Sequence, residues 1–107
     1  MNKFEQELQN NNFVCSFCLK CDKFVWPPSD LCNSCFGSIT WKNVNKIAKL
    51  VEFSQNNGEI FCIAEFEGNI RIMGSVQNSQ NLKVGQPLTL VKCDYDGKEI
   101  FVLNPSA

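Results

Sequence analysis

Two similar cysteine pairs constrain this chain more than any other feature of its sequence. Cys18 and Cys21 form one C-x2-C pair, Cys32 and Cys35 form another, and ten residues separate the pairs. Each C-x2-C loop presents two thiolates at a separation that suits two corners of a tetrahedron, so two loops supply four zinc ligands. The pattern therefore predicts a zinc ribbon that holds one structural zinc ion, with no coordination position left open to water.

Two alternatives for this cluster stay open at the level of sequence. Cys15 and Cys18 are also a C-x2-C pair, so the first pair could begin three residues earlier. We favour Cys18 with Cys21, because the ten residues before Cys32 then form a short symmetric hairpin. Iron, as a single ion or in an iron–sulfur cluster, binds the same thiolates, and an electron carrier is therefore a further interpretation.

The overall composition limits the chemistry of the chain. It has seven cysteines among 107 residues, no histidine, and a formal net charge of -1. Imidazole ligands and His-dependent catalysis are therefore excluded, and no paired-carboxylate or nucleophile–base motif replaces them. We expect no catalytic residues and a protein that is not an enzyme. The near-neutral charge also gives no general attraction for nucleic acid.

The N-terminal sequence and the cysteines together predict a cytoplasmic protein. The stretch from Met1 to Glu5 begins no apolar run of signal-peptide length, and no window of the chain approaches the ~20 apolar residues of a membrane span. Thiols stay reduced in the cytosol, where clustered cysteines are more typical of a metal site than of disulfides. Cys62 and Cys93, which lie outside the cluster, are interpreted as small buried apolar side chains.

Hydrophobic patterning divides the chain into three predicted parts. Residues 1–13 contain a short helix with Phe4 and Leu8 on one face, residues 14–42 form the zinc ribbon, and residues 43–107 form a mainly β barrel. A helix this short is marginal alone and needs a surface to pack on. Five apolar strands separated by turn residues favour a five-stranded barrel of the OB type, with an SH3-like barrel as the alternative.

Alternation within the predicted strands identifies the side chains expected to share one face. Gly74 suits a bulge or a sharp bend, and Gly37 is expected to provide the corner after the second cysteine pair. The predicted apolar faces are Ile47, Val51 and Phe53 in the first barrel strand, Ile60, Cys62, Ala64 and Phe66 in the second, and Ile70, Ile72 and Val76 in the third.

The order of these motifs resembles a family that joins a rubredoxin-like zinc ribbon to an OB-fold. The resemblance runs from about Phe4 to Leu103, although Asp22 stands where family members usually have glycine. It implies an acyl-CoA-associated accessory subunit, typically archaeal or bacterial, that binds a thiolase-type enzyme. It rests on the two cysteine pairs, on Trp26-Pro27-Pro28, on Trp41, and on the segments 70–76 and 82–88.

The resemblance also suggests which enzymes such a subunit accompanies. One example is the pair formed by acetoacetyl-CoA thiolase and hydroxymethylglutaryl-CoA synthase, and direct contact with coenzyme A is left open. The preferred function is therefore a non-catalytic accessory subunit of such a complex. Four apolar side chains are the candidate partner-binding residues, Phe4 and Leu8 in the helix and Phe24 and Trp26 in the ribbon, because the helix and the small ribbon have apolar surface to cover.

The alternative function is single-stranded nucleic-acid binding, because zinc ribbons and OB-folds both occur in proteins of that kind. This function needs a basic groove with aromatic side chains for base stacking. Lys42, Lys46 and Lys49 form the tightest basic group, but acidic side chains accompany the basic ones in the predicted barrel strands. A solvated face is therefore the favoured interpretation of these lysines, and nucleic acid is not the expected partner.

Overall fold

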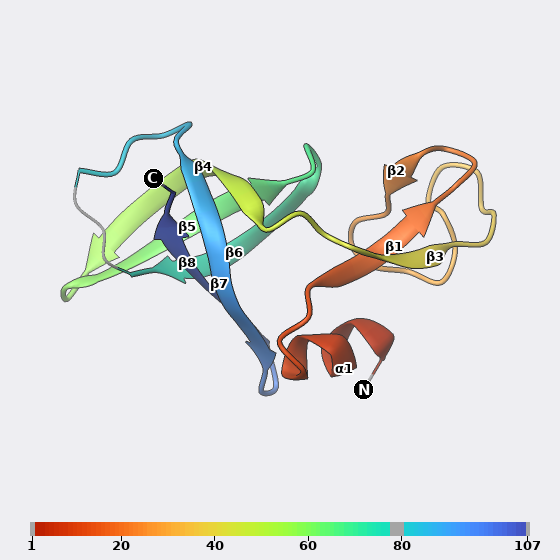
Figure 1. The fold of residues 1–107 in the computed structure, drawn as a ribbon, viewed down its shortest axis with the longest axis horizontal. Helices are drawn as coiled ribbons and strands as arrows, with labels where there is room; N and C mark the ends of the chain where they lie inside the picture. Colours follow the sequence, from red (N-terminus) through yellow and green to blue (C-terminus); the bar gives the residue numbers. More distant parts are fainter. Residues whose placement is uncertain (1, 78–80, 107) are drawn as a thin grey trace.

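The computed structural model describes residues 2–77 and 81–106, and it places a small three-stranded sheet beside a closed five-stranded barrel. Figure 1 shows the ribbon and the barrel at opposite ends of the long axis, with α1 near the junction. The predicted mainly β fold class is confirmed. The elements are α1 (Lys3–Gln9), β1 (Val14–Cys18), β2 (Lys23–Phe24), β3 (Thr40–Asn43), β4 (Ile47–Asn56), β5 (Glu59–Phe66), β6 (Ile70–Val76), β7 (Pro87–Tyr95) and β8 (Glu99–Pro105).

Helix α1 begins at a capping box and ends within the run of asparagines. The Asn2 side chain accepts the backbone N–H of Glu5 at 2.9 Å, and the Glu5 carboxylate accepts the N–H of Asn2 at 3.1 Å. Asn11 has a positive φ of 61°, which asparagine tolerates, and the chain reverses there. Within the described ranges, no helix is long and apolar enough to cross a membrane.

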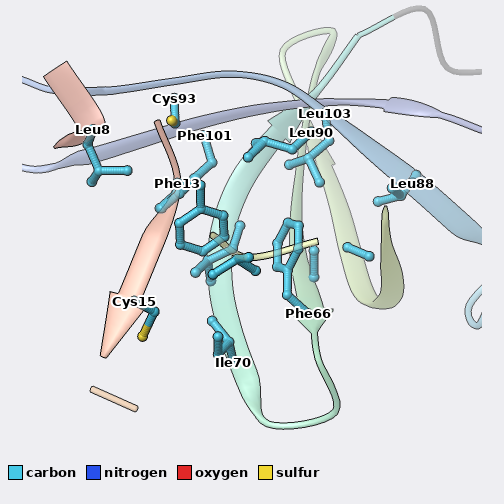
Figure 2. Close-up of a cluster of buried hydrophobic side chains, with 14 of the residues drawn as sticks. Leu8, Phe13, Cys15, Phe66, Ile70, Leu88, Leu90, Cys93, Phe101 and Leu103 are labelled. Atoms are coloured by element: carbon cyan, nitrogen blue, oxygen red, sulfur yellow. The ribbon is translucent and has the colours of Figure 1, made fainter. Parts of the chain in front are cut away.

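One continuous hydrophobic core joins the helix, the ribbon and the barrel. The ring centroid of Phe13 lies 5.1 Å from those of Phe66 and Phe101 in the barrel (Figure 2). Phe4 of the helix contacts Phe13 and Trp26 edge to face, at centroid distances of 6.4 and 5.9 Å. The three predicted parts therefore share one core, and their boundaries stay predictions.

The barrel closes in the strand order β4-β5-β6-β8-β7. Neighbouring strands are antiparallel except β6 and β8, which run parallel and pair at Ser75 with Val102 and at Val76 with Leu103. The turns between β4 and β5 and between β5 and β6 contain Asn and Gly, which adopt the positive φ angles that tight turns need. The parallel contact between β6 and β8 closes the five strands into a barrel of the OB type.

The predicted inward faces of β5 and β6 are confirmed, but the predicted face of β4 is wrong. In β4, Ala48 and Leu50 point into the core, whereas Ile47 is 50% exposed and Phe53 is 39% exposed. A β-bulge after Leu50 shifts the register against β5, so a single alternation does not run through Val51. Side-chain hydrophobicity alone did not distinguish the two faces, because the outward Ile47 is larger than the inward Ala48.

Gly74 allows β6 to approach β8 closely and does not form the predicted bulge. The pairing of β5 with β6 has no register shift at this position. A Cβ atom at Gly74 would lie 2.7 Å from Leu103 Cδ1 and 2.9 Å from the carbonyl oxygen of Phe101. The bulges lie instead after Leu50 in β4 and after Leu90 in β7. Glycine is therefore required where the parallel contact begins.

We expect Gly74→Ala to lower the free energy of unfolding by about 1–3 kcal/mol, because the added methyl group overlaps backbone that cannot easily move. Urea denaturation with an unchanged slope would measure this loss. The control is Gly58→Asn: position 58 has a φ of +81° and no heavy atom within 4 Å of an added Cβ. Asparagine adopts that conformation more readily than most residues, so the control carries backbone strain without a clash and should lose less stability than Gly74→Ala. Equal stability of Gly74→Ala and wild type would contradict the close approach.

We expect Leu8→Ala to lower the free energy of unfolding by about 2–5 kcal/mol, because Leu8 is fully buried where α1 packs on the barrel. Leu19→Ala is the matched control. Leu19 is 76% exposed, so its truncation should change stability by less than about 0.5 kcal/mol. Similar unfolding midpoints for the two variants would show that the helix is not part of the core.

Candidate metal centre

The structure brings the four predicted metal ligands together at the ribbon. The sulfur atoms of Cys18, Cys21, Cys32 and Cys35 all lie within 4.8 Å of one another. The Sγ atoms of Cys18 and Cys35 are 3.6 Å apart, and those of Cys21 and Cys32 are 3.9 Å apart. A tetrahedron with Zn–S bonds of about 2.3 Å has edges of about 3.8 Å. The donor set and its spacing are therefore compatible with one structural zinc ion.

Backbone N–H groups stabilise three of the four sulfurs. Such hydrogen bonds withdraw charge from a thiolate and fix its position. Among residues 2–77 and 81–106, no backbone N–H group donates to the fourth sulfur, that of Cys21. The three bonds run from the N–H of Cys21 to Cys18 Sγ at 3.3 Å, from Ser34 to Cys32 Sγ at 3.3 Å, and from Gly37 to Cys35 Sγ at 3.4 Å.

Each cysteine loop turns at a residue with positive φ directly after its second cysteine. The φ angles are 54° at Asp22 and 60° at Phe36. This left-handed conformation favours glycine, yet a residue other than glycine occupies it in both loops. The predicted corner at Gly37 is therefore wrong by one residue. Gly37 instead leaves room for a sulfur, since a Cβ there would lie 3.2 Å from Cys35 Sγ.

The hydrogen bonds make the thiols electrostatically unequal. The backbone N–H groups of Cys35 and Ser34 lower the pKa of the Cys32 thiol to about 6. The adjacent sulfurs of Cys35 and Cys18 raise the pKa of the Cys21 thiol to about 12. A bound divalent cation deprotonates all its coordinating thiols, because its charge outweighs the repulsion between neighbouring thiolates.

The other three cysteines are buried away from this cluster. Cys15 Sγ donates to the carbonyl oxygen of Val25 at 3.2 Å, and burial raises the pKa of its thiol to about 11. Burial likewise raises the pKa of Cys93 to about 11 and raises the pKa of Cys62. The interpretation of Cys62 and Cys93 as small buried side chains is confirmed. Cys15 belongs to the hydrophobic core and not to the group of four sulfurs.

Three of the four predicted partner-binding residues are core residues in this structure. Phe4, Leu8 and Phe24 are only 4%, 0% and 6% exposed. Within this chain they offer little exposed apolar surface, and their role in partner binding stays a prediction. The short helix packs on β7 and β1 of its own chain. Only Trp26 is partly exposed, where it lines an open groove.

This groove has a volume of about 580 Å³ and lies along the outer side of β6 and the start of β8. Trp26, Phe61, Met73 and Ile100 line it, and Met73 is 74% exposed. The groove exists because β6 and β8 pair over only two residue pairs before they diverge. Sequence reasoning missed it, since no local pattern shows where strands distant in the sequence separate.

Lys42, one of the basic group of the nucleic-acid alternative, lies against buried aromatic rings. Lys42 Nζ is 4.3 Å from the ring centroid of Phe17 and 5.7 Å from that of Phe24. Both rings are buried, at 7% and 6% exposure, so a nucleic-acid base cannot stack on them. The structure thus provides no stacking surface at Lys42.

Comparison with known proteins identifies the same fold without a close sequence relative. No family model and no curated protein matches this sequence. A solved structure described as "Ltp2-ChsH2(DUF35) aldolase" has a TM-score of 0.79 at 13% identity, covering 100% of this chain and 98% of that chain. A DUF35-family protein of unknown function from Sulfolobus solfataricus has a TM-score of 0.67 at 18% identity, covering 94% and 82%. The fold is therefore that of DUF35 proteins.

The first of these structures corrects the expectation that the chain is not an enzyme. A structure that contains this fold is described as an aldolase, so the fold by itself does not exclude a catalytic protein. The sequence argument counted only the catalytic groups of one chain. Catalytic groups in a complex can come from more than one chain, so the lack of histidine in one of them does not decide the question.

We expect the purified protein to contain one zinc ion per chain, measured by elemental analysis. Cys21→Ser should lose most of this zinc, because three thiolates hold the ion more weakly than four. Cys15→Ser is the matched control and should keep one equivalent, because Cys15 lies in the hydrophobic core. Iron in place of zinc would contradict the metal assignment. Loss of zinc from Cys15→Ser with retention in Cys21→Ser would contradict the ligand set.

Proposed function

We propose that this chain is a zinc-containing subunit of an enzyme complex that acts on acyl-CoA substrates together with a thiolase- or aldolase-type partner. The observation that carries the proposal is the match, over nearly the whole of both chains, to the structure described as Ltp2-ChsH2(DUF35) aldolase. The resemblance of the cysteine pairs and barrel segments to acyl-CoA-associated proteins supports the same function. The seven free cysteines suit a reducing compartment, and we include a cytoplasmic location in the proposal.

Exposed apolar side chains support a role in contact with another protein. Leu19, Phe36 and Met73 are 76%, 75% and 74% exposed. Phe36 is the most unusual of them, because a bulky aromatic residue occupies the left-handed region and also faces solvent. Both features are unfavourable in an isolated chain, and residues of this kind concentrate at functional surfaces.

The residues of the ribbon and the groove have different roles in this proposal. The four cysteines fix the two loops, and a bound zinc ion supplies structural cross-linking of the ribbon. The groove combines the apolar side chains of Trp26 and Met73 with the charged side chains of Lys98, Glu99 and Arg71, and Arg71 Nε is paired with Glu65 Oε2 at 2.9 Å. The apolar side chains suit an acyl chain and Lys98 suits an anionic group attached to it, so any direct contact with acyl-CoA is assigned to this groove.

We expect affinity purification of the tagged full-length chain from its native host to recover an acyl-CoA-using thiolase- or aldolase-type enzyme in stoichiometric amount. Mass spectrometry identifies the partner, and three variants then locate the contact surface. Phe36→Glu tests the ribbon, Met73→Glu tests the groove, and Val84→Glu, at a 66% exposed position, tests the segment before β7. A charge at a central contact should weaken the complex at least about 10-fold.

The same preparation distinguishes this function from the alternative, single-stranded nucleic-acid binding. Oligonucleotide binding that weakens steeply with salt, together with no acyl-CoA enzyme among the recovered proteins, would overturn the proposal in favour of nucleic-acid binding. Recovery of an enzyme of another class would also overturn it. Titration of the purified chain with an oligonucleotide at two salt concentrations provides the comparison.

A further inference from the structure

We propose that the cysteine cluster is a redox-sensitive zinc site, in which hydrogen peroxide oxidises Cys21 first and joins it to Cys32. The proposal rests on the assignment of zinc to the four cysteines and is independent of the subunit function. It assigns unequal reactivity to four sulfurs that serve equally as metal ligands. Three observations carry it: exposure, hydrogen bonding and the distances between sulfur atoms.

Exposure divides the four sulfurs into two pairs. Cys18 and Cys32 are buried, whereas Cys21 and Cys35 are partly exposed. Oxidation of a cysteine by peroxide requires thiolate character and access. Zinc binding gives all four cysteines thiolate character, so access decides between them. Cys21 and Cys35 are therefore the two cysteines of the cluster that peroxide reaches more readily.

Hydrogen bonding then distinguishes the two accessible sulfurs. Cys35 Sγ accepts the backbone N–H of Gly37 at 3.4 Å, and this bond withdraws electron density from the thiolate. Across residues 2–77 and 81–106, Cys21 Sγ has no such donor. Cys21 therefore keeps the most nucleophilic of the accessible thiolates and reacts first.

The nearby sulfur of Cys32, in the other cysteine pair, completes the reaction. Its Sγ atom lies 3.9 Å from Cys21 Sγ, so formation of a disulfide bond of about 2.05 Å needs a movement of about 1.9 Å. Cys18 and Cys35 would then remain as the only thiolates for the metal. Two thiolates are too few for a structural zinc site, so oxidation releases the ion.

The electrons and atoms balance with one peroxide per disulfide. The Cys21 thiolate attacks one peroxide oxygen, an S–O bond forms, the O–O bond breaks, and hydroxide leaves. The Cys32 thiolate then attacks the Cys21 sulfur of the sulfenic acid, an S–S bond forms, and a second hydroxide leaves. The two sulfurs lose two electrons in total, and peroxide gains them. Two protons convert the hydroxides to water, and a thiol reductant reverses the oxidation.

The test uses the zinc-loaded full-length chain, treated with limiting hydrogen peroxide while a chromogenic chelator records released zinc. Trypsin cuts after Lys20, Lys23 and Lys42, so it isolates Cys21 in the peptide 21–23, apart from Cys18 and from the peptide 24–42. We expect one zinc released per disulfide formed, and peptide 21–23 linked to Cys32 in fragmentation spectra. Reduction followed by added zinc should restore one equivalent of bound metal.

Several outcomes would overturn the proposal. A first disulfide between Cys21 and Cys18 or Cys35 would show that Cys32 is not the partner of Cys21, and one between Cys35 and Cys18 would show that hydrogen bonding does not direct the oxidation to Cys21. Zinc retained by a chain whose cluster stays reduced under this treatment would show that the site is not redox-sensitive, with the zinc assignment intact. A purified chain without zinc would overturn both. Cys62→Ala is the control and should release zinc at the wild-type rate, because Cys62 is buried outside the cluster.

Discussion

The packing of Phe13 between helix and barrel determines how the rest of the chain is arranged. Its ring contacts Phe4, Phe66 and Phe101, and its carbonyl oxygen accepts the N–H of Val44 at 2.9 Å. The chain enters the ribbon just after Phe13 and leaves it just before Val44, so both ends of the ribbon are held at the same place. The base of the ribbon is therefore anchored to the barrel core, and only its far end must be stabilised by other means.

The end of the ribbon that lies away from the barrel has few buried apolar side chains of its own. Its separate core cluster contains only Cys18, Val25 and Cys32 as buried members. Burial of so few small side chains cannot offset the conformational entropy lost by ordering two loops. Metal coordination is the interaction that can supply the missing free energy, and the four sulfur atoms converge where the hydrophobic core ends.

Local features of the sequence predicted local features of the structure, but features that depend on residues far apart in the sequence were not predicted. Cysteine spacing located the cluster, and clean alternation located the inward faces of β5 and β6. The face of β4 failed because a bulge after Leu50 interrupts the alternation. The periodicity also predicted that Leu8 would pack against another surface, but not that the barrel of the same chain would provide this surface. The groove was not predicted, because it depends on where β6 and β8 diverge, and those strands are distant in the sequence.

The ribbon and the barrel are thus stabilised by different interactions, and this difference affects how the protein can be regulated. Phe36 follows directly after Cys35, a predicted metal ligand, whereas Met73 projects from a barrel whose core is continuous and apolar. Loss of a bound metal ion would release the loop that carries Phe36, but it would leave the barrel folded, together with the side of the groove that the barrel forms. A partner that contacts both regions would then lose one contact and keep the other. The strength of such a complex would depend on the metal and redox state without unfolding of the whole chain.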